Sequence, residues 1–556
     1  MAVGMHGLMS LFRQRTRERA LVPPVLATYA RPNWIQRHRM LCLAVLLGFA
    51  FVYSAAFTLI GRFMPMPFMT PLALMLGLVV WMLPENDRPP TRALERLTFA
   101  YIVALLCWPD YLAVALPGLP WITLLRLTGF PLVITLLLCV SVSPTFRAEM
   151  KDRLSAVPAI WKCVLAVTII ALFSIALSED VSASASRFVV MLVNWTGAFF
   201  VGVYVLSLPR RIEWLGYLLW GIAIYVTAVG FQEWRFSHVP WAGHIPSFLA
   251  VQDESVMRIL AGSARAATGI YRVQSKFTTS IGLAEFLSLA LPFILHVMVR
   301  TQRTGVRLAA LASIPPIIWV LVKTDSRIGM VGLFLSLLFY ALAWGAMRWR
   351  FDKGSLFGPA VTLAYPAIFT GFIIATFFVG RLRNSVWGTG ATAASTQSRR
   401  MMYEMGIPMV LKNPQGHGLG MGGRTLGFVN PAGTMTIDTY YLAVALELGL
   451  LGFFLYFGMF LVAIFQGAKT VWRAPTGDAL YLVPVTIALT NFFVIKSVFS
   501  QLENHPLAFM LLGASVGLIW RARREEAARP AGPDAATSPA TAPRPAPALP
   551  GRALPA

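Results

Sequence analysis

Charged side chains are scarce in this sequence. They make up 13% of its 556 residues, whereas about 25% is usual for a soluble domain. Hydrophobic residues make up 57%. A water-facing surface cannot be built from so few charges, so the composition excludes a soluble globular protein. It predicts a protein that lies in a membrane.

Short motifs of several enzyme classes are also missing. No HExxH, GxSxG or GxxxxGK[ST] pattern occurs, so zinc proteolysis, acyl-serine chemistry and ATP hydrolysis have no support. The few cysteines form no CxxC or Cys/His spacing, and we interpret them as small buried hydrophobes. We therefore expect no disulfide, no metal site and no cofactor. The cysteines are Cys42, Cys107, Cys139 and Cys163.

The apolar residues fall in blocks of about 18–25, the length that a helix needs to cross a bilayer. They predict an all-α fold, a polytopic transmembrane helical bundle of about 12–14 helices. The first block begins too late and runs too long for a cleaved signal peptide, so we expect it to remain as an anchor. The approximate spans are 40–60, 64–83, 97–116, 121–141, 159–177, 188–207, 212–232, 277–299, 306–323, 328–346, 357–379, 436–466, 478–499 and 505–521.

Basic residues set the predicted orientation. Lys and Arg total 47 against 24 Asp and Glu, and most of the basic residues fall in alternate short turns between spans. One register makes about seven such turns basic, as the positive-inside rule requires, and places both termini in the cytoplasm. The excess of positive charge is thereby explained by topology, and we expect no nucleic acid partner.

The predicted spans divide the chain into regions. Residues 1–39 form a basic cytoplasmic N-terminus, and residues 40–521 form the transmembrane domain. Residues 522–556 are rich in Pro and Ala, which is typical of a disordered tail. Two extracytoplasmic loops, about 234–275 and about 380–435, are too long to be simple connectors, and such loops tend to carry function.

The two long loops and the adjoining helix ends carry many arginines and lysines, although they lie on the outer side. A basic outer face suits an anionic ligand, and the fork of an arginine suits phosphate or pyrophosphate. The alternative is that long translocated loops escape the positive-inside rule and carry solvated arginines.

Residues 323–327 interrupt an apolar stretch with the charged side chains of Lys323, Asp325 and Arg327. Charges at such a depth cost several kcal/mol unless they are paired or face a wet cavity, so they suggest a functional site. The alternative is that Asp325 pairs with Arg327 or with Lys323 and only stabilises the turn.

A second polar constellation lies in the C-terminal half. Residues 399–414 read as an amphipathic surface helix that stops at Asn413-Pro414. Residues 416–423 contain five glycines, whose backbone N–H groups could form an anion nest. Asp438 lies at the mouth of the next span, either as a helix cap or as a base for a hydroxyl. Inside the spans, Arg126, Glu285, Glu447 and Lys496 are expected to face the bundle interior and to pair with one another.

Four segments, taken in order, resemble the O-antigen ligase/O-antigen polymerase family of membrane glycosyltransferases. They are RVQSKFTTSIGLAEFL (272–287), DSRIG (325–329), the stretch from Arg399 through NPQGHGLG (413–420), and DTYYL (438–442) followed by ELGLLG (447–452). The resemblance covers about residues 270–455, and the preceding spans match only in being hydrophobic.

The resemblance implies metal-independent transfer of a glycan from undecaprenyl diphosphate to a sugar hydroxyl, at the outer face of the bacterial inner membrane. By this resemblance, Arg272, Arg327 and Arg399 would bind the diphosphate, and Asp438 would act on the hydroxyl. The predicted catalytic residues are Asp438, Arg327 and Arg399, and the predicted substrate-binding residues are Arg272, Arg400, Lys323, His417 and Arg424.

Asp438 occupies the place where many ligases of this family carry a His-Asn pair. This departure favours a polymerase of an exopolysaccharide or O-antigen over an O-antigen ligase that modifies lipid A core. A transporter or flippase of lipid-linked glycan is a third reading, although the sequence lacks the repeated halves typical of transporters. The expected partners are the undecaprenyl-diphosphate-linked glycan, membrane lipid, a chain-length regulator and a flippase.

Overall fold

The fold comes from a computed structural model of the chain. It describes residues 38–56, 75–86, 88–115, 121–251, 256–257, 260, 271–351, 354, 356–380, 383, 393–429, 435–473 and 476–528. The basic N-terminus, most of the predicted span 64–83 and most of the Pro/Ala-rich tail lie outside these residues. The chain divides into two compact units: Met1–Leu76 with Leu116–Pro120, and Gly77–Ala115 with Trp121–Ala556. The first contains the apolar helix α4 (Arg39–Ala56), and all elements below belong to the second.

The described residues include 11 helices that are long and apolar enough to cross a membrane, which confirms the all-α polytopic class. The predicted span 97–116 corresponds to the shorter helix α6 (Thr91–Cys107). The eleven, in chain order, are α7 (Leu124–Val142), α9 (Pro158–Ser174) with η3 (Ile175–Leu177), α10 (Val181–Met191) with η4 (Leu192–Gly197) and α11 (Ala198–Val205), α12 (Arg211–Phe236), α14 (Ser280–Arg300), α15 (Thr304–Lys323), α16 (Arg327–Phe351), α17 (Phe357–Phe378), α21 (Tyr440–Trp472), η6 (Gly477–Tyr481) with α22 (Leu482–Ile495), and α23 (His505–Ala527).

Several local elements were not expected from the sequence. After α6 the chain forms a short hairpin of β1 (Ala113–Val114) and β2 (Ile122–Thr123), so the span predicted to reach residue 116 ends early. A further helix, α8 (Pro144–Ser155), follows α7.

The second long loop contains α19 (Ala393–Lys412) and α20 (Gly422–Leu426). The surface helix predicted at 399–414 therefore exists, begins earlier, and ends before Asn413-Pro414 as expected.

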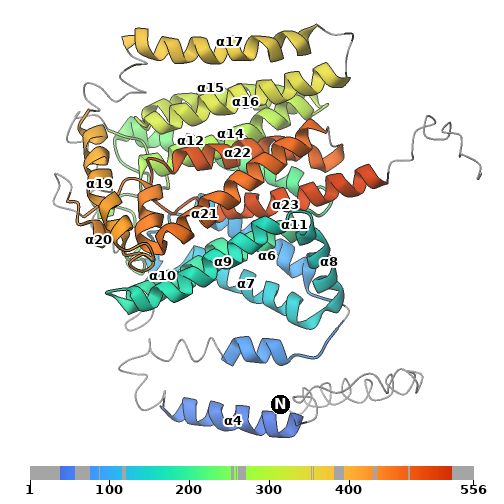
Figure 1. The fold of residues 1–556 in the computed structure, drawn as a ribbon, viewed down its shortest axis with the longest axis vertical. Helices are drawn as coiled ribbons and strands as arrows, with labels where there is room; N and C mark the ends of the chain where they lie inside the picture. Colours follow the sequence, from blue (N-terminus) through green and yellow to red (C-terminus); the bar gives the residue numbers. More distant parts are fainter. Residues whose placement is uncertain are drawn as a thin grey trace, which may run out of the picture. The chain divides into compact units, whose positions relative to one another are not determined.

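Helix α14 lies at the centre of the bundle, and 89% of its apolar window is buried. It packs against α12, α15, α16 and α22, while α17 contacts mainly α16 and lies at one edge (Figure 1). Within this core, Glu285 of α14 pairs with Lys496 at 2.9 Å, and both side chains are fully buried. Asn504 donates to Glu285 Oε2 at 2.9 Å. The prediction that Glu285 and Lys496 are structural partners thus agrees with the geometry.

Helix α21 is broken at Gly449, which has φ 72° and ψ −177°. The segment 413–418 fills the break with its own backbone. His417 N donates to Leu446 O at 2.8 Å and Gly418 N donates to Glu447 O at 3.2 Å, while Leu450 N donates to Pro414 O at 2.9 Å. These bonds replace those that the break removes from the helix, as a membrane environment demands.

Close approach of the two backbones explains the glycines. A Cβ on Gly416 would lie 2.6 Å from Glu447 O, and one on Gly449 would collide with Pro414 O. Gly416, Gly418 and Gly449 also have positive φ angles of 90°, 104° and 72°, a region that costs other residues about 1–2 kcal/mol. These glycines lie in two of the segments that resemble the family. They therefore allow the backbone of the glycine-rich loop to pack directly against α21.

Replacing Gly449 by Ala should destabilise the protein by at least about 2 kcal/mol, because the new methyl group meets both a positive φ and a backbone oxygen. Thermal unfolding of the purified protein measures the effect. Gly458→Ala in the same helix is the matched control, since nothing lies within 4 Å of its Cβ position. Equal unfolding temperatures for the two variants would contradict the interlock.

Candidate functional site

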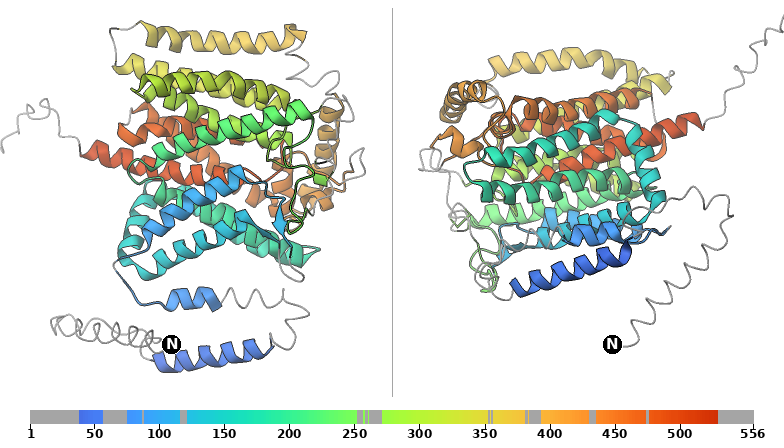
Figure 2. Two further views of the ribbon diagram at one scale, coloured as in Figure 1. Left: turned by 180° about the vertical axis from the view of Figure 1, so that it is seen from behind. Right: turned by 60° about the horizontal axis from the view of Figure 1, so that its bottom comes forward.

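Helix α19 crosses the end of the bundle where α16 and α21 begin (Figures 1 and 2). Its residues Met402, Gly406 and Val410 are buried, with the spacing of one helical face. Met402 and Val410 belong to a small apolar cluster with Leu442 and Leu446 of α21. The amphipathic pattern read from the sequence thus attaches α19 to α21.

The turn at 323–327 is held by Arg272. Its Nε donates to Thr324 O at 2.9 Å and its NH2 donates to Asp325 O at 3.3 Å. Asp325 adopts a positive φ of 48°, which Asp tolerates better than most residues. Lys323 lies over the rings of Trp234 and Trp319, at 4.9 Å and 5.4 Å from their centroids. Arg272 therefore fixes the segment from which Arg327 begins α16.

From Thr396 onward, α19 contacts the two other segments that carry predicted catalytic residues. These are the 323–327 turn and the residues just before α21. Arg327 NH1 donates to Thr396 Oγ1 at 3.5 Å, and Arg399 follows one turn later on α19. Asp438 N donates to Met402 Sδ at 3.4 Å. From residue 396 to residue 402 the helix rises only about 9 Å. Arg327 and the backbone of Asp438 thus contact the short stretch of α19 that carries Arg399.

Asp438 does not cap α21. The N-cap is Thr439, which makes no side-chain capping bond, so the capping alternative is wrong. Thr436 Oγ1 donates to Asp438 Oδ1 at 3.3 Å, and the carboxylate is partly exposed. Tyr403 OH lies 2.8 Å from Thr439 Oγ1 and fixes the backbone beside Asp438 to α19.

His417 is engaged through both ring nitrogens. Nδ1 donates to Leu446 O at 3.1 Å, because a carbonyl oxygen only accepts, and Nε2 accepts from Asn413 Nδ2 at 2.9 Å. Of the other predicted binding residues, Arg400 pairs with Glu404 at 2.9 Å and is mostly exposed. Arg424 lies 3.7 Å from Asp180.

The segment before α14 is anchored by buried acidic groups. Glu233 accepts from Tyr271 OH at 2.7 Å and from Ser275 N at 2.6 Å. Glu503 accepts from Thr278 N at 2.8 Å. Burial raises the pKa of Glu503 and lowers the pKa of Lys276, because each charged form loses hydration. This segment, the first of the four family-like pieces, is rigid at its C-terminal part and presents Arg272 at its start.

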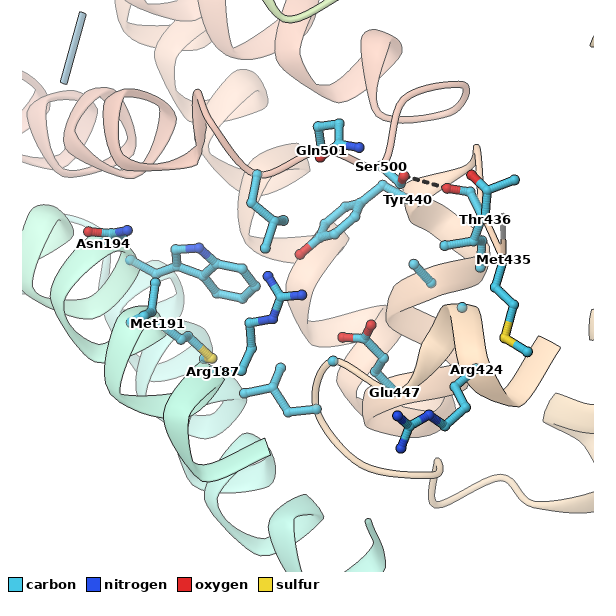
Figure 3. A pocket seen from close by; sticks show the side chains of 18 residues that line it. Arg187, Met191, Asn194, Arg424, Met435, Thr436, Tyr440, Glu447, Ser500 and Gln501 are labelled. Atoms are coloured by element: carbon cyan, nitrogen blue, oxygen red, sulfur yellow. Dashed lines mark hydrogen bonds between the residues drawn. The ribbon is translucent and has the colours of Figure 1, made fainter. Parts of the chain in front are cut away.

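A cavity of about 440 Å³ opens between α10, η4, α20 and α21. Figure 3 shows Arg187 and Glu447 directed into it from facing helices, with Tyr440 beside them. Gly422 N donates to Glu447 Oε1 at 3.3 Å. The glycine-rich segment therefore does form a nest of N–H groups, but a carboxylate of the protein occupies it. Arg424, Asn194, Trp195 and Gln501 also line the cavity.

Sequence reasoning did not find Arg187, which lies one residue before the predicted span 188–207 and belongs to no motif. Its only sequence signal is that it is a single charge beside an apolar block. In the part of the chain that the structure describes, no group of three His, Cys, Asp or Glu side chains could hold a metal ion.

The geometry by itself defines the class of protein. It is a multi-pass helical membrane protein with a polar, arginine-bearing site at one end of its bundle. Residues 312–457 match the model of the family described as O-Antigen ligase. This part of the chain is similar to that family, and the match supports the resemblance to the O-antigen ligase/polymerase family. The matched part runs from α15 into α21 and includes α19, Arg327 and Asp438. No curated protein matches the chain.

Replacing His417 by Ala should lower the free energy of unfolding by about 1–3 kcal/mol, because the Asn413 amide loses its partner and Leu446 O loses one of its two donors. Thermal unfolding in detergent measures this loss. His244→Ala is the control, since His244 is exposed and its Nδ1 contacts only the nearby Ala242 O. Loss of activity with unchanged unfolding would instead make His417 a substrate contact.

Proposed function

We propose that this protein polymerises undecaprenyl-diphosphate-linked repeat units of an exopolysaccharide or O-antigen at the periplasmic face of the bacterial inner membrane. The observation that carries the proposal is that Arg327 and the backbone of Asp438 contact the same short stretch of α19 that carries Arg399. The family match supports a membrane enzyme of the O-antigen ligase/polymerase type that uses a lipid-linked glycan. In this proposal both termini are cytoplasmic and α19 lies on the periplasmic side.

The arginines would act on the diphosphate. Transfer breaks the bond between the sugar C1 and the diphosphate oxygen, and negative charge grows on the leaving undecaprenyl diphosphate. Arg327 and Arg399 would stabilise that charge through paired N–H donors. Arg272 would keep Arg327 in place through the 323–327 turn, and Lys323 and Arg400 would add positive charge around the site.

Asp438 would act on the acceptor. Its carboxylate takes the proton of a sugar hydroxyl while the hydroxyl oxygen forms the new bond to C1. Partial exposure at the start of α21 leaves room for a sugar chain to approach. Arg424 would contact the glycan, and His417 would hold the loop rather than contact substrate. The proposed partner proteins are a flippase and a chain-length regulator.

Two other functions are less well supported. A ligase that transfers glycan to lipid A core would be expected to carry a histidine where this chain has Asp438, and His417 is engaged elsewhere. A transporter would use broken helices to expose backbone dipoles to its cargo. The break in α21 is instead filled by residues 414–418.

Arg327→Ala and Arg399→Ala should each lower polymer formation at least about 100-fold, because each removes a donor to the developing charge. Lysine should rescue poorly, since it lacks the bidentate fork. Polymer length and the lipid-linked intermediates are measured in cells, and single repeat units should accumulate on the carrier at the outer face. Units trapped inside would instead indicate a flippase.

The matched control is Arg235→Ala, in which the arginine lies in the last turn of α12, over the ring of the neighbouring Phe236. It should leave polymer unchanged. Normal polymer in both site variants would refute the role of these arginines in binding the diphosphate.

Asp438→Asn should abolish polymer formation while leaving thermal unfolding unchanged, because the amide keeps the shape but cannot accept the proton. The measurements are polymer yield and the unfolding temperature of the purified protein. Asp438→Glu serves as the comparison, since it retains a base and should retain part of the activity. Full activity of the Asn variant would exclude Asp438 as the base.

A further inference from the structure

The cavity beside Arg187 is distinct from the α19 face that carries the proposed chemistry. Residues 436–440 lie between the two: the backbone N of Asp438 contacts α19, whereas Ile437 and Tyr440 line the cavity. Thr436 belongs to both, because it lines the cavity and donates to Asp438. A ligand in the cavity would therefore reach within one residue of the proposed base.

Arg187 lines the cavity and carries a charge that an anionic ligand would neutralise. It lies six residues into the apolar segment that begins at Val181, and its side chain is exposed where it lines the cavity. Its guanidinium makes no hydrogen bond with the residues that the structure describes, and no ion pair with them within 4.0 Å. Glu447, across the cavity, lies near enough to interact with its charge but not to pair with it.

The backbone next to Arg187 is irregular in a way that shapes the cavity. Residues Leu192–Gly197 form a π-helical segment, and such segments occur frequently at functional sites. Two of its residues, Asn194 and Trp195, line the cavity. Asn194 Oδ1 accepts from Tyr101 OH at 2.8 Å, which fixes the amide. Gly420 lets the loop approach Arg187, since a Cβ there would lie 3.2 Å from its Nε.

The lining matches the groups of a sugar. Glu447 offers an acceptor for ring hydroxyls, Asn194 and Gln501 offer amides, and the buried rings of Trp195 and Tyr440 form part of the wall. The volume of about 440 Å³ falls in the range of about 300–1,000 Å³ usual for small-ligand pockets. A bilayer lipid tail has no hydrogen-bonding groups and would leave these polar side chains without partners.

The charged residues of the lining indicate which kind of sugar the cavity would bind. Of the charged lining residues, Arg424 is offset by Asp180 at 3.7 Å, so Arg187 is the one whose charge remains for a ligand. A guanidinium fork binds a single carboxylate well, whereas Glu447 would repel a more highly charged diphosphate. We propose that this cavity is a saccharide subsite that binds a sugar bearing a carboxylate, with Arg187 on the carboxylate and Glu447 on the hydroxyls. The inference rests on the proposed function, because it defines one unit of the glycan substrate.

Binding to the purified full-length protein in nanodiscs tests the subsite without catalysis. Saturation-transfer NMR is recorded with methyl glucuronide, with neutral methyl glucoside and with inorganic pyrophosphate. The glucuronide should bind more tightly than the glucoside, and Arg187→Gln should weaken it at least about tenfold, to the level of the glucoside. Arg424→Gln should have a smaller effect, because its charge is already offset.

Arg473→Gln is the control, since Arg473 is exposed and lies at the opposite end of α21. Equal binding of the two glycosides, or an Arg187→Gln variant that binds glucuronide as the parent does, would overturn the subsite. Pyrophosphate that displaces the glucuronide in an Arg187-dependent way would also overturn it and would place the diphosphate here. If Arg327→Ala leaves polymer intact while glucuronide binding still requires Arg187, the proposed role of Arg327 fails and the subsite stands.

Discussion

The interlock between the glycine-rich loop and the break in α21 is the constraint on which the rest of the site depends. Gly449 interrupts the helix, and the backbone of residues 414–418 satisfies the groups that the interruption frees. The same contact directs Glu447 into the cavity and positions the start of α21, where Asp438 lies. Without the glycines the loop could not approach, and both polar regions would lose their shared wall.

Helix α19 is the other element that shapes the site. Its buried face packs on α21, and its first turns carry Arg399 and the contact of Thr396 with Arg327. One helix thus links two segments that are far apart in the sequence, the 323–327 turn and the start of α21. A catalytic group held between a packed helix and a broken one is more precisely placed than one on a free loop.

The sequence predicted the helices well because apolar length is a strong signal, and α17 begins at the residue expected. The hairpin after α6 was missed because two-residue strands leave no periodicity to read. The glycine loop was recognised as a nest, yet its occupant, Glu447, lies in another motif and could not be paired with it from spacing alone. Arg187 was missed for a similar reason, since only tertiary packing brings it to Tyr440 and Glu447.

The buried pair between Glu285 and Lys496 constrains how the chain enters the bilayer. Glu285 belongs to a central helix that is synthesised about midway, whereas Lys496 follows α22 near the C-terminus. Until Lys496 has been made, the carboxyl group of α14 has no cation to balance it in an apolar setting. The central helix therefore reaches its final environment only after translation is nearly complete, and chains that stop before α22 leave an acidic group for quality control to detect.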